Sequence, residues 1–484
     1  MNKKNKEIIA ILASALIMIV FNRLPNSEAL SHEALCAIGI FIVSLVLWIF
    51  VSIDWPSLIT IFLVALLPSY GFNETLKGVF GNSTVAFLLF SFMLVYPLSK
   101  TNFVRRTTIA FITNKIAIKG PWYFVSFLMF AVTFIGLFIS PSVLFVAFMP
   151  FFEDICNVLD IKKGTRVGSM LMLGTAFCIS LSSGMTPIGH VWPTLAMSAY
   201  EGAYGVAINS FEYMAFAIPT GIILVILLLL VFRFIYNPKD INLIDQKKVL
   251  VFKKEDNKME LSEKIILTVM VLVVLLWITP SLLKGIWPTY YKVINDMGTA
   301  MPPLLGCILL FIIKVDDKRL LDFKEVTTKG VMWGAILMTG AATLIGGLLT
   351  NTTLGISAYI SSVLSPIASA LNPGLLVLFF VTVAIIETNF SSNIVTTTLI
   401  TSIIIAVSSA LPEGSVNIGA LVAIIGLCAA ICNMTPAGQS TINTVAIGSG
   451  YTTSKDMFIY GLIFAILAII CIAFIGYPIA ALLI

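Results

Sequence analysis

Apolar segments without charge recur along the chain and constrain its fold more than any other feature. A helix of about 20 residues crosses the roughly 30 Å hydrocarbon core of a bilayer. Five segments of about that length or longer contain no Lys, Arg, Asp or Glu: 34–53, 78–99, 213–232, 265–283 and 457–484. Because 59% of the residues are hydrophobic and 11% are charged, we predict an all-α polytopic protein of the cell membrane.

The first 21 residues, "MNKKNKEIIAILASALIMIVF", have a basic start and an apolar body. No small-residue cleavage site with a soluble domain follows, so we interpret this segment as a first spanning helix and not as a signal peptide. The seven cysteines are scattered through apolar segments without CxxC spacing. This pattern indicates small core residues and neither a metal site nor a disulfide framework.

The positions of Lys and Arg predict how the chain crosses the membrane. The uncharged run between Lys119 and Glu153 has basic flanks on both sides, so both its ends should face the cytoplasm. It therefore predicts a helical hairpin at about 120–155 with Ser140, Pro141 and Ser142 at its tip. The region 192–212 is expected outside. Segments 237–263 and 314–329 are expected in the cytoplasm. This alternation gives about eleven transmembrane helices plus two re-entrant hairpins, with the N-terminus cytoplasmic and the C-terminus extracellular.

Several motifs occur twice, in the same order. "GMTPIGH" at 184–190 is echoed by "NMTPAGQ" at 433–439, "KGVFG" at 77–81 by "KGVMWG" at 329–334, and the tip near Ser140 by "TNFSSNIVTTT" at 388–398. The KGV segments should run in opposite directions, which predicts two inverted-topology repeats, as in many secondary transporters.

These matches divide the chain into two halves around a linker. The N-terminal half, 1–236, would contain the first hairpin and a broken helix at about 167–200. The cytoplasmic linker would be 237–263. The C-terminal half, 264–484, would contain a hairpin at about 374–411 and a broken helix at about 415–450.

The Thr-Pro pairs indicate interrupted helices. Proline removes a backbone donor, and broken backbone at membrane depth is tolerated only where protein or a hydrated site receives it. Freed carbonyls with Ser, Thr and Asn oxygens suit Na⁺, while half-helix N-termini attract an anion. The alternative is that Pro187 and Pro436 only kink packed helices. That interpretation is favoured for a single Thr-Pro but not for a matched pair beside two hairpins.

These motifs resemble the divalent anion/sodium symporter (DASS) family of the ion transporter superfamily. That family carries Ser-Asn-Thr at each hairpin tip and a Thr-Pro-containing break in the helix that follows. Ser392 and Asn393 match Ser-Asn, and Ile394 replaces the Thr. The first tip has Ser140-Pro141-Ser142 instead, and the breaks read Thr186-Pro187-Ile188-Gly189 and Thr435-Pro436-Ala437-Gly438. The segment "FGNSTVAFLLFSFML", 80–94, looks like the family's helix before its cytoplasmic arm. The resemblance, which extends in outline over nearly the whole chain, implies an elevator mechanism and a homodimer.

The resemblance also implies site residues. The first Na⁺ site would use Ser140, Ser142, Gly184 and Thr186, and the second Ser391, Ser392, Asn393 and Thr435. The anionic substrate would contact Ser140, Thr186, Pro187, His190, Ser392, Asn393, Thr435 and Pro436. The alternative is that the hydroxyls bond their own backbone or a neighbouring helix.

Two titratable side chains have open roles. His190 could bind the anion or carry a proton, or could simply pack at the end of the break. Glu387 is a functional candidate as an intramembrane carboxylate, or it lies at a hydrated hairpin edge. The segment "VRRTTIAFITNKIA", 104–117, mixes basic and apolar residues as an interfacial helix does.

Neither motif region contains Lys or Arg. A bound anion would therefore be held by hydroxyls, amides, helix N-termini and co-bound Na⁺. This arrangement would couple binding of the anion to binding of Na⁺. We predict a sodium-coupled symporter of small organic dianions, succinate-like C4-dicarboxylates first, with sulfate or another anion, or cation/proton exchange, as alternatives. The sequence contains no HExxH, GxSxG or GxGD arrangement, so an enzyme is not expected. A channel would not need two hairpins, and no nucleic-acid partner is expected.

Overall fold

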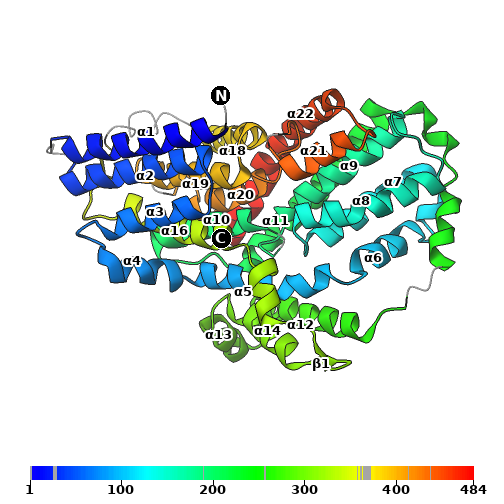
Figure 1. Cartoon of the computed structure of the whole chain (residues 1–484), viewed down its shortest axis with the longest axis horizontal. Helices are drawn as coiled ribbons and strands as arrows, with labels where there is room; N and C mark the ends of the chain where they lie inside the picture. The colour runs from blue at the N-terminus through cyan, green and yellow to red at the C-terminus, as the bar shows by residue number, and fades with distance from the viewer. Residues whose placement is uncertain are drawn as a thin grey trace.

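The computed structural model describes residues 3–25, 30–188, 190–254, 258–356, 358–359, 362, 372–411, 414–436 and 438–484. Helices dominate this part of the chain (Figure 1). The only strands in it, β1 (Lys314–Val315) and β2 (Lys318–Arg319), pair as an antiparallel ribbon with Val315 opposite Lys318. The prediction of an all-α membrane fold is confirmed.

The first half is a series of helices that leads into a hairpin and a broken helix. Its leading elements are α1 (Lys3–Arg23), α2 (His32–Phe50), α3 (Trp55–Ala65), α4 (Gly71–Phe80), α5 (Ser83–Ser99), α6 (Phe103–Ile112) and the 3₁₀ turn η1 (Ala117–Lys119). The hairpin and the following elements are α7 (Pro121–Gly136), α8 (Pro141–Val158), α9 (Arg166–Ser183), α10 (Val191–Tyr204), α11 (Ser210–Leu230) and the π-helical η2 (Val231–Tyr236).

The predicted linker contains the 3₁₀ helices η3 (Lys239–Leu243) and η4 (Gln246–Lys254). The elements that follow up to the second hairpin are α12 (Leu261–Leu283), α13 (Pro288–Asp296), α14 (Met301–Ile312), the β-ribbon, α15 (Phe323–Glu325), the π-helical η5 (Val326–Gly330) and α16 (Trp333–Thr350). The second hairpin and the remaining elements are α18 (Pro373–Phe390), α19 (Asn393–Ser408), α20 (Ile418–Cys428), α21 (Ser440–Gly448), α22 (Ser454–Cys471), the π-helical η6 (Ile472–Gly476) and α23 (Tyr477–Leu483).

Nine helices of the described chain are long and apolar enough to cross a membrane, or up to eleven if each bent pair counts as one span. The bent pairs are α4 with α5, at 43°, and α13 with α14, at 75°. These candidates include α8 and α18, which are arms of the two hairpins, whereas the eleven crossings expected from the sequence are counted in addition to the hairpins. The segments predicted at 34–53, 213–232 and 457–484 coincide with α2, α11 and the α22–α23 run.

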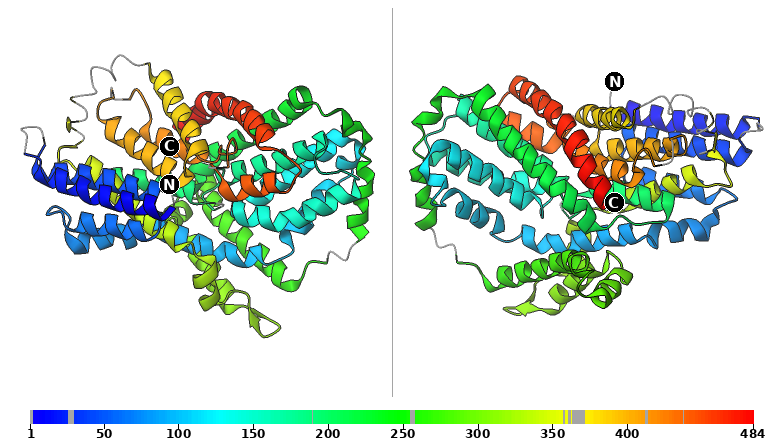
Figure 2. Two further views of the ribbon diagram at one scale, coloured as in Figure 1. Left: turned by 45° about the horizontal axis from the view of Figure 1, so that its top comes forward. Right: turned by 180° about the vertical axis from the view of Figure 1, so that it is seen from behind.

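Two helical hairpins approach the middle of the molecule from opposite sides. Hairpin α7–α8 lies with α9 on one side, and hairpin α18–α19 lies with α20 on the other (Figures 1 and 2). Each hairpin packs against its own broken helix, as α7 does on α9 and α19 does on α20. This opposed arrangement is the one that inverted repeats produce.

Helix α10, the second part of the first broken helix, packs closely on α16. The Ser198 hydroxyl donates to Thr339 O at 3.3 Å, and Thr350 Oγ1 donates to Ala203 O at 2.9 Å. A Cβ added at Gly346 would lie 2.6 Å from Ala199 O, so glycine is required for this approach. Helix α16 begins just after the second KGV motif. Because α10 follows the first break directly, the α10–α16 contact places α16 beside the first half of the site.

Candidate functional site

The first hairpin turns where the sequence placed its tip. Helix α7 ends at Gly136 and α8 begins at Pro141, which occupies the first helical position. Proline is suited to this position because its missing N–H has no helical partner there. Ser140 is the N-cap residue. Its carbonyl accepts from Leu144 N at 2.8 Å, while its side chain makes no capping bond.

The first break joins α9 to α10 and is tied to the first tip. Helix α9 ends at Ser183, and α10 begins only at Val191. In between, Thr186 Oγ1 donates to Leu137 O in the first tip at 2.7 Å. Tyr213 OH donates to Gly184 O at 2.8 Å. One carbonyl at the end of α9 is therefore satisfied by a side chain from α11 rather than by the next helical turn.

The second hairpin has the same plan. Helix α18 ends at Phe390 and α19 begins at Asn393, with Ser392 as its N-cap. The Thr435 hydroxyl of the second break donates to Asn389 O. Leu137 and Asn389 each stand three residues before the tip serine, Ser140 or Ser392. The two Thr-Pro motifs therefore make the same contact in both halves, which is the structural role that their threonines share.

Asn393 adds a contact that the first tip lacks. Its Nδ2 donates to Ala429 O at 3.1 Å, and Thr388 Oγ1 donates to the same carbonyl at 3.1 Å. Ala429 follows directly after α20. The amide thus joins the hairpin tip to the end of the half-helix. At the matching position of the first tip stands Pro141, which has no side-chain donor.

The site predicted from the sequence does not include a group of asparagines that lies around the second break. Asn389 Nδ2 donates to Ile431 O at 2.6 Å, and its Oδ1 accepts from Met434 N at 2.7 Å. Asn443 Nδ2 donates to Thr435 O at 2.7 Å and to Cys432 O at 3.1 Å. Both asparagines are fully buried. They satisfy backbone groups that the interrupted helix leaves without partners.

The two breaks meet at the centre of the molecule. Asn433 Nδ2 donates to Ser180 Oγ on α9 at 3.0 Å and to Asn443 Oδ1 at 2.8 Å. A Cβ added at Gly184 would lie 2.6 Å from the Ala430 Cβ, so glycine permits the first break to pass close to the second. Asn433 Oδ1 is buried and has no hydrogen-bond partner in the described part of the chain.

The predicted site residues differ in their exposure. Thr186, Pro187 and His190 are buried, whereas Thr435 is half-buried and Pro436 is exposed. Among the tip residues, Ser140, Ser142 and Ser391 are half-buried, Ser392 is exposed and Asn393 is buried. The structure thus gathers the predicted residues into two separate tip-and-break pairs, of which the second is the more open.

His190 and Glu387 both lie close to these pairs. The His190 ring packs 4.2 Å from the Trp192 ring, centroid to centroid, and its buried Nδ1 has no hydrogen-bond partner among the described residues. Glu387 is half-buried on α18, where Thr396 Oγ1 of the other hairpin arm donates to its carboxylate.

The donor atoms of the site are oxygens and neutral amides. The tips and breaks contain no Lys, Arg, Asp or Glu. In the residues that the structure describes, no group of three or more His, Cys, Asp or Glu side chains could hold a metal ion. Hydroxyl, amide and carbonyl oxygens are hard ligands, so the donor set fits an alkali cation better than a transition metal.

Two opposed hairpins, each bound to an interrupted helix in an all-α membrane fold, define a secondary transporter of the inverted-repeat type. A family model described as the sodium:sulfate symporter transmembrane region matches residues 3–484. The chain belongs to this family of membrane transporters, which confirms the resemblance drawn from the tip and break motifs.

Curated relatives and a solved structure agree with this membership. The sodium-dependent dicarboxylate transporter SdcS of Staphylococcus saprophyticus is 24% identical over 502 residues, covering 98% of this chain and 92% of that protein. SdcS of Staphylococcus aureus strain USA300 is also 24% identical, over 461 residues, covering 90% and 86%. The Alcanivorax borkumensis YdaH transporter has a TM-score of 0.56 at 12% identity, with 98% of both chains covered. This last likeness concerns the fold alone.

Proposed function

We propose that the chain is a sodium-coupled symporter of small organic dianions, with C4-dicarboxylates such as succinate as the first candidates. The observation that carries the proposal is the pair of matching contacts from Thr186 to Leu137 O and from Thr435 to Asn389 O. They hold two hairpin tips against two interrupted helices in a region without cationic side chains. The curated relatives that cover most of the chain are named sodium-dependent dicarboxylate transporters.

Charge balance explains why such a site would need a cation. An anion placed between the tips meets hydroxyls, amides and half-helix N-termini, which supply only partial positive charge. Na⁺ bound beside it would compensate the remaining charge, so each ion would raise the affinity for the other. The first Na⁺ site would use Ser140, Ser142, Gly184 and Thr186. The second would use Ser391, Ser392, Asn393 and Thr435. The anion would lie between them, near Pro187, His190 and Pro436.

The same proposal includes how the protein moves and assembles. The contacts between tips and breaks support a rigid body that carries the site, and the close α10–α16 contact would form one boundary of that body. We assign halves 1–236 and 264–484 around the linker 237–263. The elevator motion and the homodimer come from the family resemblance. The cytoplasmic N-terminus and extracellular C-terminus come from the distribution of Lys and Arg.

Sulfate is the second candidate substrate. The description of the matching family model names sulfate, and Pro141 removes an amide at the first tip that the dicarboxylate-type motif has. Cation/proton exchange is a further alternative, supported by the buried Nδ1 of His190, which has no hydrogen-bond partner among the described residues.

The test is uptake of labelled succinate into proteoliposomes under an inward Na⁺ gradient and with K⁺ replacing Na⁺. Wild-type protein should accumulate succinate only with Na⁺, and Asn393→Ala should remove this accumulation. Asn372→Ala is the matched control because Asn372 caps the far end of the same hairpin, where its Oδ1 accepts from Gly374 N at 2.9 Å.

The outcomes separate the candidates. Sodium-dependent uptake of labelled sulfate without uptake of succinate would replace the dicarboxylate by sulfate. Uptake of neither anion, with a pH change driven by Na⁺, would establish exchange and overturn symport. Equal loss of uptake in Asn372→Ala and Asn393→Ala would show that the amide at the tip acts through stability alone.

A further inference from the structure

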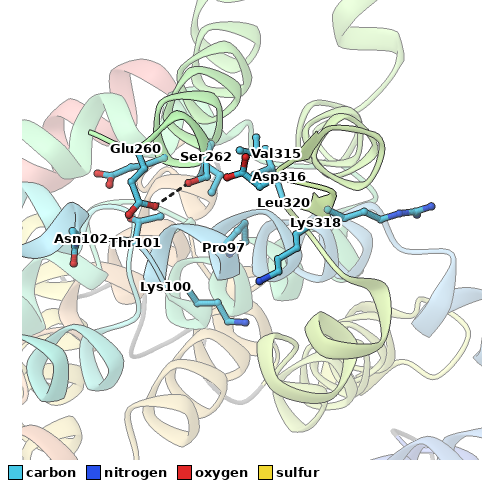
Figure 3. Close-up of a pocket in the computed structure, with 13 residues that line it drawn as sticks. Pro97, Lys100, Thr101, Asn102, Glu260, Ser262, Val315, Asp316, Lys318 and Leu320 are labelled. Carbon is cyan, nitrogen blue, oxygen red and sulfur yellow. Dashed lines mark hydrogen bonds between the residues drawn. The ribbon is translucent and has the colours of Figure 1, made fainter. Parts of the chain in front are cut away.

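A cavity with charged walls lies outside the tip-and-break pairs. It has a volume of about 390 Å³ and is enclosed by the C-terminal end of α5, the N-terminal end of α12 and the β1–β2 ribbon. Figure 3 shows the carboxylates of Glu260 and Asp316 on one side of the cavity, and the ammonium ends of Lys100 and Lys318 on the other. The cavity therefore has separate acidic and basic sides.

Four charged groups that line the cavity make no ion pair among the described residues: the basic Lys318 and Arg319 and the acidic Glu260 and Asp316. Lys100 is bound to Glu325, whereas exposed Lys318 makes no ion pair within the described ranges. On the acidic side, Glu260 accepts only a long hydrogen bond from Ser262 Oγ, at 3.4 Å, and Asp316 is likewise exposed without an ion pair in the described part. A ligand that carries both a phosphate and an ammonium group would satisfy both sides.

An apolar groove lies next to this cavity along α12. It has a volume of about 360 Å³, lies between α12 and α14, and is lined by Val269, Leu272, Leu276, Leu305 and Leu309 among others. Val269 stands one helical turn beyond Ile266, which lines the charged cavity. The groove is open, since Leu272 is 49% exposed and Leu305 is 43% exposed.

The length of the groove matches one membrane leaflet. Its far end is marked by the contact between Thr279 Oγ1 and Tyr290 OH, at 2.9 Å. The α12 segment from Val269 to Thr279 rises about 15 Å at 1.5 Å per residue, which is half of the roughly 30 Å hydrocarbon core. A single acyl chain would fill this distance, with its headgroup at the charged cavity.

We propose that this cavity and groove together bind one amino-phospholipid, such as phosphatidylethanolamine. Its phosphate would contact Lys318, its ammonium group would contact Glu260 and Asp316, and one acyl chain would lie between α12 and α14. A purely anionic lipid would place its charge beside the two carboxylates, whereas the ammonium group of an amino-phospholipid would pair with them. The site lies on α5, α12, α14 and the ribbon, apart from both hairpins, so it is independent of the transported substrate.

The experiment measures lipid retention by the full chain in detergent. Native mass spectrometry after titration with phosphatidylethanolamine or phosphatidylglycerol gives the affinity of each lipid for wild type, Lys318→Gln and Glu260→Gln. The control is Lys314→Gln, since Lys314 is exposed on the same ribbon but does not line the cavity. We expect wild type to prefer phosphatidylethanolamine, and each cavity variant to bind it about fivefold more weakly, the effect of roughly one interfacial charge. Lys314→Gln should bind like wild type.

Several results would overturn the proposal. Equal affinity for both lipids, or an equal effect of all three variants, would show general charge attraction. Equally tight binding of glycerophosphoethanolamine, which has no acyl chains, would assign the cavity to a soluble ligand. Cross-linking of cysteines placed at Leu272 and Leu305 between two copies of the chain would assign the groove to a protein interface. Thermal unfolding without added lipid verifies that each variant is folded.

Discussion

The two tip-and-break pairs share one contact and differ in nearly everything around it. In both, a threonine before proline donates to a carbonyl three residues before the tip serine. In the second pair, Asn389 and Asn393 add side-chain bonds to the backbone of the break. The matching positions of the first pair hold Leu137 and Pro141, which have no side-chain donors.

Exposure accounts for this difference. Thr186 and Pro187 of the first break are buried, whereas Thr435 is half-buried and Pro436 is exposed. The first break is buried among apolar side chains, and hydroxyls of neighbouring helices bond its backbone: Tyr213 OH donates to Gly184 O, and Thr194 Oγ1 donates to Pro187 O. The second break opens to the surface, so its conformation depends on side-chain hydrogen bonds to carbonyls and N–H groups that no helix satisfies. The first half of the site is therefore held by packing with a few hydroxyl donors, and the second mainly by side-chain amides.

Asn389→Leu should have the largest effect, because it gives the second tip the leucine that stands at the matching position of the first tip. Ile431 O and Met434 N would both lose their partners. Stranded buried polar groups cost about 1–3 kcal/mol each, so we expect a loss of stability on the order of 3 kcal/mol and uptake no higher than in protein-free vesicles. The measurements are thermal unfolding in detergent and sodium-dependent uptake.

Leu137→Ala is the matched control for Asn389→Leu. Leu137 contacts Thr186 through its backbone carbonyl, which the substitution keeps. Uptake should remain, with a stability loss from side-chain packing only. If both variants lost uptake to the same extent, the distinction between a break fixed by amides and one fixed by packing would be wrong.

The pair Thr186→Val and Thr435→Val compares the shared contact in its two settings. Thr186 is 2% exposed, so Thr186→Val leaves Leu137 O without this donor in apolar surroundings, at a cost of about 1–2 kcal/mol. The loss for Thr435→Val should be smaller, about 0.6 kcal/mol, because Asn389 and Asn443 also hold the second break. Thermal unfolding of both variants side by side gives the order. The reverse order would contradict the account based on exposure.

Much of this architecture could be predicted from local sequence signals. Serine before proline marked the first tip, and α8 begins at Pro141. Ser-Ser-Asn marked the second tip, and α19 begins at Asn393. The two Thr-Pro motifs indicated breaks, and helices end before both. Each of these signals lies within a few consecutive residues, so it can be recognised from the sequence alone.

The asparagines that hold the second break could not be assigned in the same way. Asn389 lies inside the quoted tip motif, but its partners Ile431 and Met434 stand more than 40 residues further along the chain. Nothing local distinguishes it from any other polar residue in an apolar segment. Asn433 and Asn443 likewise take their roles from the meeting of the two breaks, which only the folded chain creates.

Pro141→Asn should have the smallest effect, and it tests whether an amide alone makes the two tips equivalent. Replacing proline at the first helical position costs less than about 1 kcal/mol. Counting along the repeats, the carbonyl that corresponds to Ala429 O is Ser180 O, which already accepts from Ser183 Oγ at 2.5 Å. Because Ser180 O already has this donor, the new amide would not satisfy an unpaired carbonyl, so we expect stability within 1 kcal/mol of wild type and little change in the Na⁺ concentration for half-maximal uptake. A marked fall in that concentration would show that the first tip lacks only its amide, and that packing does not set the difference between the halves.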